Sequence, residues 1–292
     1  KKSKNFYRNK NVLIAGASGF IGNPLCKTLS NSHFFVRGSI RSDDLFLTNN
    51  QIEYVSVGNI NHQTYWKDIL NGIDCIIHCA GRAHRMNENR NSNEYYLMNT
   101  ESTKNLAEQA AEAGVKRLIF LSSIKVNGEF TNKIGSKHKF FFNDIPNAKD
   151  VYAKSKLEAE KILFEISSRL GLEVVVIRLP LTYGNNVKGN LARLIKIIRQ
   201  NFPLPLSMIE NQRSMIGVDN LIDLLICCID HPKANGKIFL ASDGKDLSTS
   251  DLIKLIASSM GRKANLFPLP IFILKFLGLI FKRREEINRL IG

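Results

Sequence analysis

The chain has 292 residues, of which 44% are hydrophobic and 23% are charged, as in an ordinary soluble globular protein with one large α/β domain or one domain plus a smaller one. Five cysteines without metal-type spacing argue against a disulfide-rich secreted protein and against a metal site. The net charge of +15 invites a nucleic-acid interpretation, but the lysines are scattered and no nucleic-acid motif accompanies them, so we expect no nucleic-acid partner.

The apolar run at residues 12–15 predicts a buried parallel strand that opens into three glycines spaced three apart. Gly16 permits a tight turn, Gly19 lets the backbone approach a pyrophosphate, and Gly22 lets the next helix lie against the strand. Residues 20–29 are helical in pattern, and the N-terminus of such a helix attracts anions. The loop therefore predicts a dinucleotide site, with a plain strand-turn-helix as the alternative. We expect the cofactor to contact Gly16, Ser18, Gly19, Phe20, Ile21 and Gly22.

A second strand, at residues 34–40, ends at Arg41. In dinucleotide-binding folds an acidic residue at this point bonds the ribose 2′-hydroxyl, whereas arginine accommodates a 2′-phosphate. Arg41 therefore favours NADP(H). NAD(H) stays open because Asp43 and Asp44 follow closely, and the alternative for Arg41 itself is a solvated loop charge.

Further strands are predicted at residues 52–57, 73–79 and 118–121, with helices at 66–70 and 99–113. This alternation predicts a doubly wound parallel sheet of the Rossmann type, which binds ligands at the carboxyl ends of its strands. Several candidate residues follow directly on strand ends. Besides Arg41, the expected cofactor contacts beyond the glycine loop are Asn59, Ile60, Cys79, Ala80, Gly81, Asn99, Tyr152 and Lys156.

Tyr152 and Lys156 stand four residues apart at the start of a helix predicted to reach about residue 169, so both can address one point. An ammonium favours the phenolate and brings a tyrosine into range for acid–base work at neutral pH. Ser123, a hydroxyl at a strand end, supplies a second donor to a carbonyl oxygen. We therefore expect Ser123, Tyr152 and Lys156 to be catalytic, although a Tyr-x-x-x-Lys pair alone also occurs by chance.

The order of these motifs resembles the extended short-chain dehydrogenase/reductases that act on nucleotide sugars, and the resemblance covers nearly the whole chain. It rests on residues 16–22, 78–81, Asn99, 121–128 and 152–156. Residues 178–184 are similar to an Arg-Pro-x-x-x-Tyr-Gly run of that family, with Leu179 in place of the usual proline. The resemblance implies a Rossmann domain and a smaller α/β substrate domain. We expect the first at residues 1–178 with returns near 213–243, and the second mainly at 179–292.

In the second half, residues 190–191 and 213–221 resemble segments that bind the nucleotide diphosphate in UDP-sugar epimerases. A bidentate arginine on phosphate makes physical sense, and an ordinary surface arginine is the alternative. We therefore expect a UDP-sugar substrate and a homodimer. The expected substrate contacts are Ser123, Arg82, Lys188, Asn190 and Arg213.

Within the family, residues 124–128, 203–206 and 242–249 look most like bacterial surface-polysaccharide (O-antigen, lipopolysaccharide) enzymes that reduce a UDP-4-keto-6-deoxy-N-acetylhexosamine. This resemblance implies a 4-keto reductase, with a proton from Tyr152 and hydride delivered to sugar C4. Ile124 and Lys125 replace the carboxylate pair that 4,6-dehydratases need, which disfavours dehydration. A UDP-glucose or UDP-N-acetylglucosamine 4-epimerase is the first alternative, and a non-catalytic dinucleotide- or RNA-binding Rossmann protein is the second.

Near the C-terminus, residues 248–260 predict a capped helix, and residues 271–281 are apolar apart from Lys275. The second stretch is too short to span a bilayer. Residues 271–284, with their basic end, could lie on an anionic membrane surface, but a helix packed on the substrate domain is the favoured alternative. Residues 1–10 lack an apolar signal-peptide segment, so we expect a cytoplasmic protein with a possible membrane contact.

Overall fold

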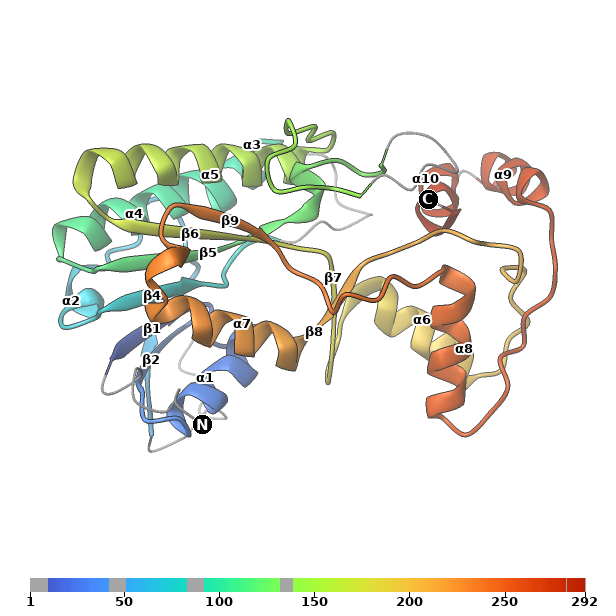
Figure 1. Cartoon of the computed structure of the whole chain (residues 1–292), viewed down its shortest axis with the longest axis horizontal. Coiled ribbons are helices and arrows are strands. Elements are labelled where there is room, and N and C mark those ends of the chain that lie inside the picture. The colour runs from blue at the N-terminus through green and yellow to red at the C-terminus, as the bar shows by residue number, and fades with distance from the viewer. Residues whose placement is uncertain (1–9, 42–50, 83–91, 132–138, 282, 292) are drawn as a thin grey trace. The chain divides into compact units, whose positions relative to one another are not determined.

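The computed structural model describes residues 10–41, 51–82, 92–131, 139–281 and 283–291. The chain divides into two compact units, one of Lys1–Pro180 with Val218–Ala241 and one of Leu181–Gly217 with Ser242–Gly292 (Figure 1). From sequence we expect the first domain to end at residue 178 and to return near 213–243. In the structure the first unit ends at Pro180 and returns at Val218–Ala241. The roles of the two units stay predictions.

The first unit is built on a seven-stranded sheet in the order β3-β2-β1-β4-β5-β6-β9, and every neighbouring pair is parallel. The predicted doubly wound parallel sheet is therefore confirmed. Its strands are β1 (Asn11–Ala15), β2 (Phe35–Ile40), β3 (Ile52–Ser56), β4 (Cys75–His78), β5 (Arg117–Ser123), β6 (Glu173–Leu179) and β9 (Lys237–Leu240). The short, partly buried β9 carried no period-two pattern and was not among the predicted strands.

Helices cover both faces of this sheet, with α4 and α5 on one side and α1 and α7 on the other (Figure 1). The helices are α1 (Gly22–Ser30), α2 (Lys67–Leu70), α3 (Ser92–Tyr95), α4 (Ser102–Glu112), α5 (Val151–Leu170) and α7 (Val218–Asp230). Leu13, Ile76 and Phe120 from the strands meet Leu106 of α4 and Leu163 of α5 in one buried cluster. Burial on both faces explains the continuous apolar runs of β1, β4 and β5.

Three short helical turns lie among the longer described elements of the first unit, and one of them alters a predicted helix. The helix expected from Asn99 is preceded by a π-helical turn, η2 (Tyr96–Glu101), and α4 begins only at Ser102. A 3₁₀ turn, η3 (Ile124–Val126), follows β5, and another, η4 (Pro232–Ala234), precedes β9. Single π-helical turns are frequent at functional sites, and this one contains Asn99.

The second unit contains a parallel pair of short strands, β7 (Leu181–Tyr183) and β8 (Met215–Gly217), and four helices among its described residues. These helices are α6 (Gly189–Arg199), α8 (Thr249–Ser259), α9 (Ile271–Ile280) and α10 (Arg284–Ile291). Ile198 of α6, Ile253 and Ala257 of α8, and Leu274 of α9 share its buried core. The predicted cap of α8 is present, since the Ser248 hydroxyl accepts a bond from the Asp251 N–H at 2.9 Å.

Candidate active site

The glycine loop joins β1 to α1 with no room for side chains at two of its glycines. Gly16 has a φ of +92°, and a Cβ there would lie 2.9 Å from the backbone nitrogen of Ala80. A Cβ on Gly22 would lie 2.2 Å from the Gly16 carbonyl oxygen. The first contact brings the end of β4 against the loop, and the second lets α1 start directly beside it. Both glycines therefore serve the roles predicted for them.

The start of α1 has the properties of an anion site. Its N-cap residue, Ile21, makes no side-chain capping bond, and its first turn contains no acidic residue. Ser18 and Gly19 are exposed beside it. The backbone amides and the positive end of the helix dipole therefore fit the pyrophosphate of a dinucleotide. Ser39, which sequence reasoning missed, accepts a 3.1 Å bond from the Gly16 N–H through its hydroxyl and braces the loop from β2.

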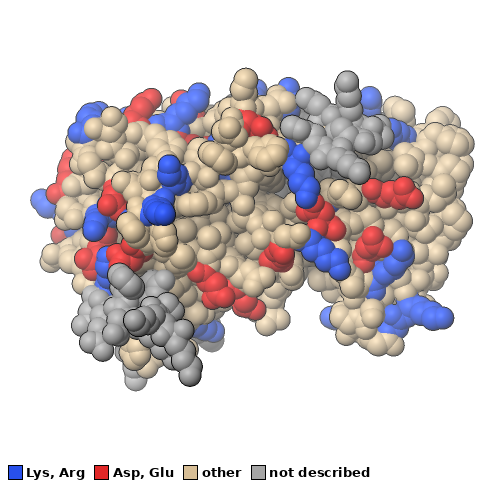
Figure 2. Space-filling model, in the orientation of Figure 1, with Lys and Arg blue, Asp and Glu red and all other residues tan. Residues whose placement is uncertain are grey.

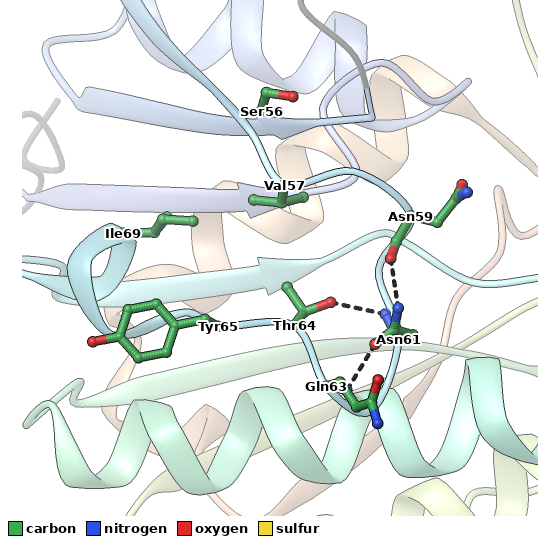
Figure 3. A pocket seen from close by; sticks show the side chains of 8 residues that line it. All are labelled: Ser56, Val57, Asn59, Asn61, Gln63, Thr64, Tyr65 and Ile69. Atoms are coloured by element: carbon green, nitrogen blue, oxygen red, sulfur yellow. Dashed lines mark hydrogen bonds between the residues drawn. The ribbon is translucent and has the colours of Figure 1, made fainter.

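The ends of β2 and β3 form the next part of this edge. Arg41 follows β2 and is exposed, while Asp43 and Asp44 lie outside the described residues. After β3, Asn59 helps to line a pocket of about 460 Å³ (Figure 3). Ile60 packs against the core cluster instead of lining this pocket. The lining residues are Ser56, Val57, Asn59, Asn61, Gln63, Thr64, Tyr65 and Ile69.

The pocket wall after β3 is a turn that hydrogen bonds between its own residues hold in place, and these bonds fix the position of Asn59. Asn61 donates its side-chain amide to the Asn59 carbonyl at 3.1 Å, and its own backbone N–H bonds the Thr64 hydroxyl at 2.9 Å (Figure 3). Gln109 of α4 donates to the Thr64 carbonyl at 3.0 Å from behind. A polar pocket at the carboxyl end of a parallel strand is where dinucleotides bind in such sheets.

Ser123 and Tyr152 meet at the carboxyl end of β5. Ser123 is the last residue of β5 and caps η3, accepting a 3.3 Å bond from the Lys125 N–H. Tyr152 lies in the first turn of α5, which Asp150 caps by accepting a 2.7 Å bond from the Ala153 N–H. The Tyr152 and Ser123 side chains are hydrogen-bonded to each other. The structure thus brings two of the three predicted catalytic residues into direct contact.

Lys156 is buried one helical turn further along α5. Its Nζ donates to the Leu121 carbonyl of β5 at 2.9 Å and lies 4.4 Å from the centre of the Phe120 ring. A Cβ added to Gly81 would lie 3.2 Å from this Nζ, so the end of β4 passes directly beside it. Through Ala80 and Gly81, close contacts therefore run from the glycine loop to Lys156.

Burial shifts the pKa values of Tyr152 and Lys156 in opposite directions. Desolvation raises the pKa of Tyr152 to about 12, although the hydrogen bond from Ser123 works against this shift. Desolvation lowers the pKa of Lys156 to about 8, opposed by the carboxylate of Glu160. The lowered pKa expected for Tyr152 is therefore not seen in this structure, in which the pKa of the phenol is raised. Desolvation is the largest influence on this phenol, and the carboxylate of Asp150 adds to it. Neither can be read from a Tyr-x-x-x-Lys spacing.

Asn99 ties the loop after β4 to α5. Its side-chain oxygen accepts the Arg82 N–H at 2.8 Å, and its amide donates to the Ser155 hydroxyl at 3.0 Å. The structure gives this expected cofactor contact a positioning task within the protein. Cys79 continues β4, where its N–H bonds the Ala15 carbonyl at 2.9 Å. The Arg82 guanidinium pairs with Glu94 at 2.9 Å, so part of its charge is neutralised within the protein.

A buried ion pair stands behind the Ser123 end of β5. Arg178 of β6 binds Glu160 of α5 with two bonds, Nε to Oε1 at 3.0 Å and Nη2 to Oε2 at 2.7 Å, and both side chains are 3% exposed. Ser122 donates to the same carboxylate at 2.5 Å, and Arg178 donates to the Asn127 side chain at 2.9 Å. Sequence reasoning missed this network. A buried charge requires a partner, but the sequence does not say which residue supplies it.

Lys125 occupies one of the two positions that distinguish dehydratases from this chain. Its Nζ lies 2.5 Å from Asp150, the carboxylate that caps α5, and 3.8 Å from Glu129. The side chain therefore steadies the start of α5. A cation paired in this way does not supply the acid and base needed to expel water.

The diphosphate contacts expected in the second unit lie at the start of α6 and at Arg213, which is bridged to Leu247. Lys188 is the N-cap residue of α6 and makes no side-chain capping bond, and Asn190 is exposed in the first turn. Arg213 pairs through its backbone with Leu247, and burial lowers the pKa of its guanidinium. An α6 first turn without acidic residues suits an anion.

The surface charge is mixed. On the face drawn in Figure 2, Lys and Arg alternate with Asp and Glu over the described residues and do not gather into one basic patch. Within the described ranges, no three His, Cys, Asp or Glu side chains are grouped so that they could hold a metal ion. No helix in the described part of the chain is long and apolar enough to cross a membrane.

The fold and the glycine loop define a dinucleotide-binding protein of the Rossmann type. The family described as "NAD dependent epimerase/dehydratase family" matches residues 12–241, and the chain belongs to it. A UDP-glucose 4-epimerase of Vibrio cholerae is 39% identical over 291 residues, which cover 97% of this chain and 86% of the relative. An N-acetyl-α-D-glucosaminyl-diphospho-ditrans,octacis-undecaprenol 4-epimerase of Escherichia coli O157:H7 is 27% identical, covering 90% of this chain and 76% of the relative.

A solved structure shares the fold. The UDP-glucuronic acid 4-epimerase of Bacillus cereus, crystallised with UDP-glucuronic acid and NAD, aligns with a TM-score of 0.74 at 22% identity and covers 89% of this chain and 86% of its own. At this level of identity the likeness establishes the fold alone. The relatives named here are epimerases, so the reductase assignment is not favoured by them, and neither is the NADP preference drawn from Arg41.

Proposed function

We propose that this protein is an NAD-dependent 4-epimerase of a UDP-linked hexose or N-acetylhexosamine. The observation that carries the proposal is the contact between Tyr152 and Ser123 at the end of β5, with Lys156 buried one turn along the same helix. The 39% identical epimerase of Vibrio cholerae, aligned over nearly the whole chain, supports inversion at C4 over the 4-keto reduction expected from sequence.

The residues divide the work at the sugar C4 oxygen. When bound, NAD would accept the hydride from C4 of the sugar and return it to the same carbon. Tyr152 takes and returns the proton of the C4 hydroxyl, and Ser123 donates a hydrogen bond to the same oxygen. Burial favours the neutral phenol of Tyr152, the form that donates a proton, so proton removal needs added positive charge nearby. Lys156, a cation on the same face of α5, supplies part of that charge and keeps its place through the Leu121 carbonyl.

The cofactor site of this chain fits a dinucleotide in its glycine loop and its uncapped α1 start. NAD is proposed over NADP because the solved epimerase with the same fold holds NAD. Arg41 is exposed at the end of β2, consistent with the solvated loop charge that sequence reasoning kept as its alternative. On this proposal Arg41 contributes little to cofactor choice.

For the substrate, we infer that Arg213 and the start of α6 bind the diphosphate. Arg213 is partly buried and cationic, and the first turn of α6 contains Asn190 and no acidic residue. The homodimer expected from sequence stays a prediction, which a solution mass measurement decides. A role in the assembly of a bacterial surface polysaccharide also stays a prediction.

One assay separates epimerase from reductase. The purified protein is incubated with NAD and, in turn, UDP-glucose and UDP-N-acetylglucosamine, and the products are identified by NMR. The proposal expects the corresponding C4 epimer to form with no net consumption of nicotinamide cofactor. A second arm offers a UDP-4-keto-6-deoxy-N-acetylhexosamine with NADH or NADPH. Stoichiometric oxidation of the cofactor in that arm, with no inversion in the first, would establish the reductase instead.

A further inference from the structure

Helix α9 buries one side and leaves the other to solvent. Leu274 is buried in the core of the second unit, and Gly278 lies against α10, where a Cβ would meet Ile287 at 2.8 Å. On the opposite side Phe272, Phe276, Leu279 and Ile280 are 72%, 62%, 60% and 56% exposed. We call these four residues the α9 face. Their spacing places them on one stripe of the helix, and Phe281, just beyond its end, is also exposed.

An apolar stripe of this size is unusual on a soluble surface, where exposed apolar side chains normally stand singly. The exposed side of α9 is not a part of the core of the second unit. The other side of the helix already packs on that core and on α10 (Figure 1). The region of α9 is drawn almost wholly in tan in Figure 2, the colour of uncharged residues. A contiguous patch of this kind marks an interaction surface, so we ask what partner the α9 face fits.

The charges around α9 identify the kind of partner. Residues 260–286 contain six cations and two carboxylates, Glu285 and Glu286, so cations are in excess around α9. One of them, Lys275, is exposed within α9 itself, and Arg283 and Arg284 are exposed just after it. The six are Arg262, Lys263, Lys275, Lys282, Arg283 and Arg284. An aromatic, apolar stripe edged by cations matches the interface of an anionic lipid bilayer, which accepts apolar groups and attracts positive charge.

A second copy of the chain is a poor occupant of this face. A symmetric contact would bring Lys275, Arg283 and Arg284 of both copies to the same interface, where like charges repel. A span is excluded by length, because ten residues rise only about 15 Å against a hydrocarbon core of roughly 30 Å. The remaining geometry is a helix lying in the plane of the interface with its stripe toward the acyl chains.

We propose that α9 docks the protein on an anionic membrane surface, with Phe272, Phe276, Leu279 and Ile280 inserted and Lys275 at the headgroups. The docking concentrates the enzyme at the membrane without entering its catalytic machinery. It goes beyond the proposed function, since epimerisation of a soluble nucleotide sugar does not require it.

The test is flotation of the full chain with vesicles. One set contains phosphatidylglycerol and phosphatidylcholine, and the other contains phosphatidylcholine alone. The wild-type chain floats with the first set and much less with the second, and added salt weakens the binding. Phe272→Ser/Phe276→Ser lowers the bound-to-free ratio by roughly tenfold or more, since two inserted rings are lost. Lys275→Glu lowers it less, and only on anionic vesicles.

The matched control is Phe202→Ser/Leu255→Ser, which removes two exposed apolar side chains of the same unit from outside α9. It leaves flotation unchanged, and both double variants keep the thermal midpoint of the wild-type chain. Sedimentation of the same variants without vesicles tests the second copy as occupant. The proposal is overturned by any of three results: no flotation of the wild type, equal flotation on both vesicle sets, or a wild-type dimer that Phe272→Ser/Phe276→Ser converts to monomer.

Discussion

The carboxylate of Glu160 accepts two hydrogen bonds from Arg178 and a third from the hydroxyl of Ser122, the neighbour of Ser123, which we propose to be catalytic. Ser122 and Arg178 also face each other in the register of β5 and β6. Lys156 lies one turn before Glu160 on α5. The ion pair therefore links the strand end that carries Ser123 to the helix that carries Tyr152 and Lys156, and we assign Glu160 and Arg178 as positioning residues.

Arg178→Met should destabilise the protein by about 3–5 kcal/mol, because it leaves the Glu160 carboxylate buried without its cation. Denaturant unfolding measures the loss. Glu160→Leu/Arg178→Met removes both charges and should recover most of it. If the double variant is stable, its kcat should still fall while the KM for the UDP-sugar changes little. An undiminished kcat in the stable double variant would mean that the pair has no positioning role.

Tyr152→Phe should lower kcat by about 10²–10⁴-fold, since a positioned proton donor and acceptor contributes on that scale. Binding of NAD should be unchanged, because the ring keeps its packing against Tyr95 with centroids 6.4 Å apart. Steady-state kinetics and a cofactor titration check both parts. Ser123→Ala should lower kcat by a smaller factor, because it removes only a hydrogen bond to the C4 oxygen. Turnover near the wild-type rate in Tyr152→Phe is incompatible with the mechanism.

Lys156 gives the stability of the protein a distinct dependence on pH. Burial lowers the folded pKa to about 8 from an ordinary 10.5, so between these values the unfolded chain holds a proton that the folded chain has released. Stability therefore rises with pH across that window. Thermal unfolding of Lys156→Met should lack this rise. Lys154→Met, which removes an exposed lysine from the same helix, is the control and should retain it.

The titration of Tyr152 should make the stability of the protein fall with pH, above the range in which Lys156 makes it rise. Its folded pKa of about 12 lies above an ordinary value of 10, so the folded chain keeps a proton that the unfolded chain loses, and stability falls from about pH 10 to 12. A Tyr152→Phe chain with the same fall as the wild type would show that the phenol is not buried as described.

Arg41→Ala should change the affinity for NADH and NADPH by similar, small factors, because the proposed cofactor has no 2′-phosphate for Arg41 to bind. Calorimetric titration of both cofactors against wild type and variant decides this. A wild-type chain that binds NADPH more tightly and loses only that affinity in Arg41→Ala would restore the preference for NADP.

Much of the first unit could be predicted from sequence because its signals are local. The run at residues 12–15, the glycines at 16, 19 and 22, and the Tyr152/Lys156 spacing each depend on neighbours within a few positions. The Glu160–Arg178 pair, the Ser39 brace and the shifts of Tyr152 and Lys156 depend on strand register and burial. Those quantities exist only once the chain is folded. The π-helical turn at Asn99 was hidden for the same reason, since an ordinary helical pattern runs through it.

The most direct test of the proposed 4-epimerase follows a label at sugar C4. UDP-N-acetylglucosamine and UDP-glucose, each deuterated at C4, are incubated with the protein and unlabelled NAD, and the products are analysed by NMR and mass spectrometry. The account predicts the C4 epimer with deuterium retained at C4, since the hydride leaves and returns to the same carbon. Absence of the epimer with both sugars, or an epimer that has lost its deuterium, would contradict it.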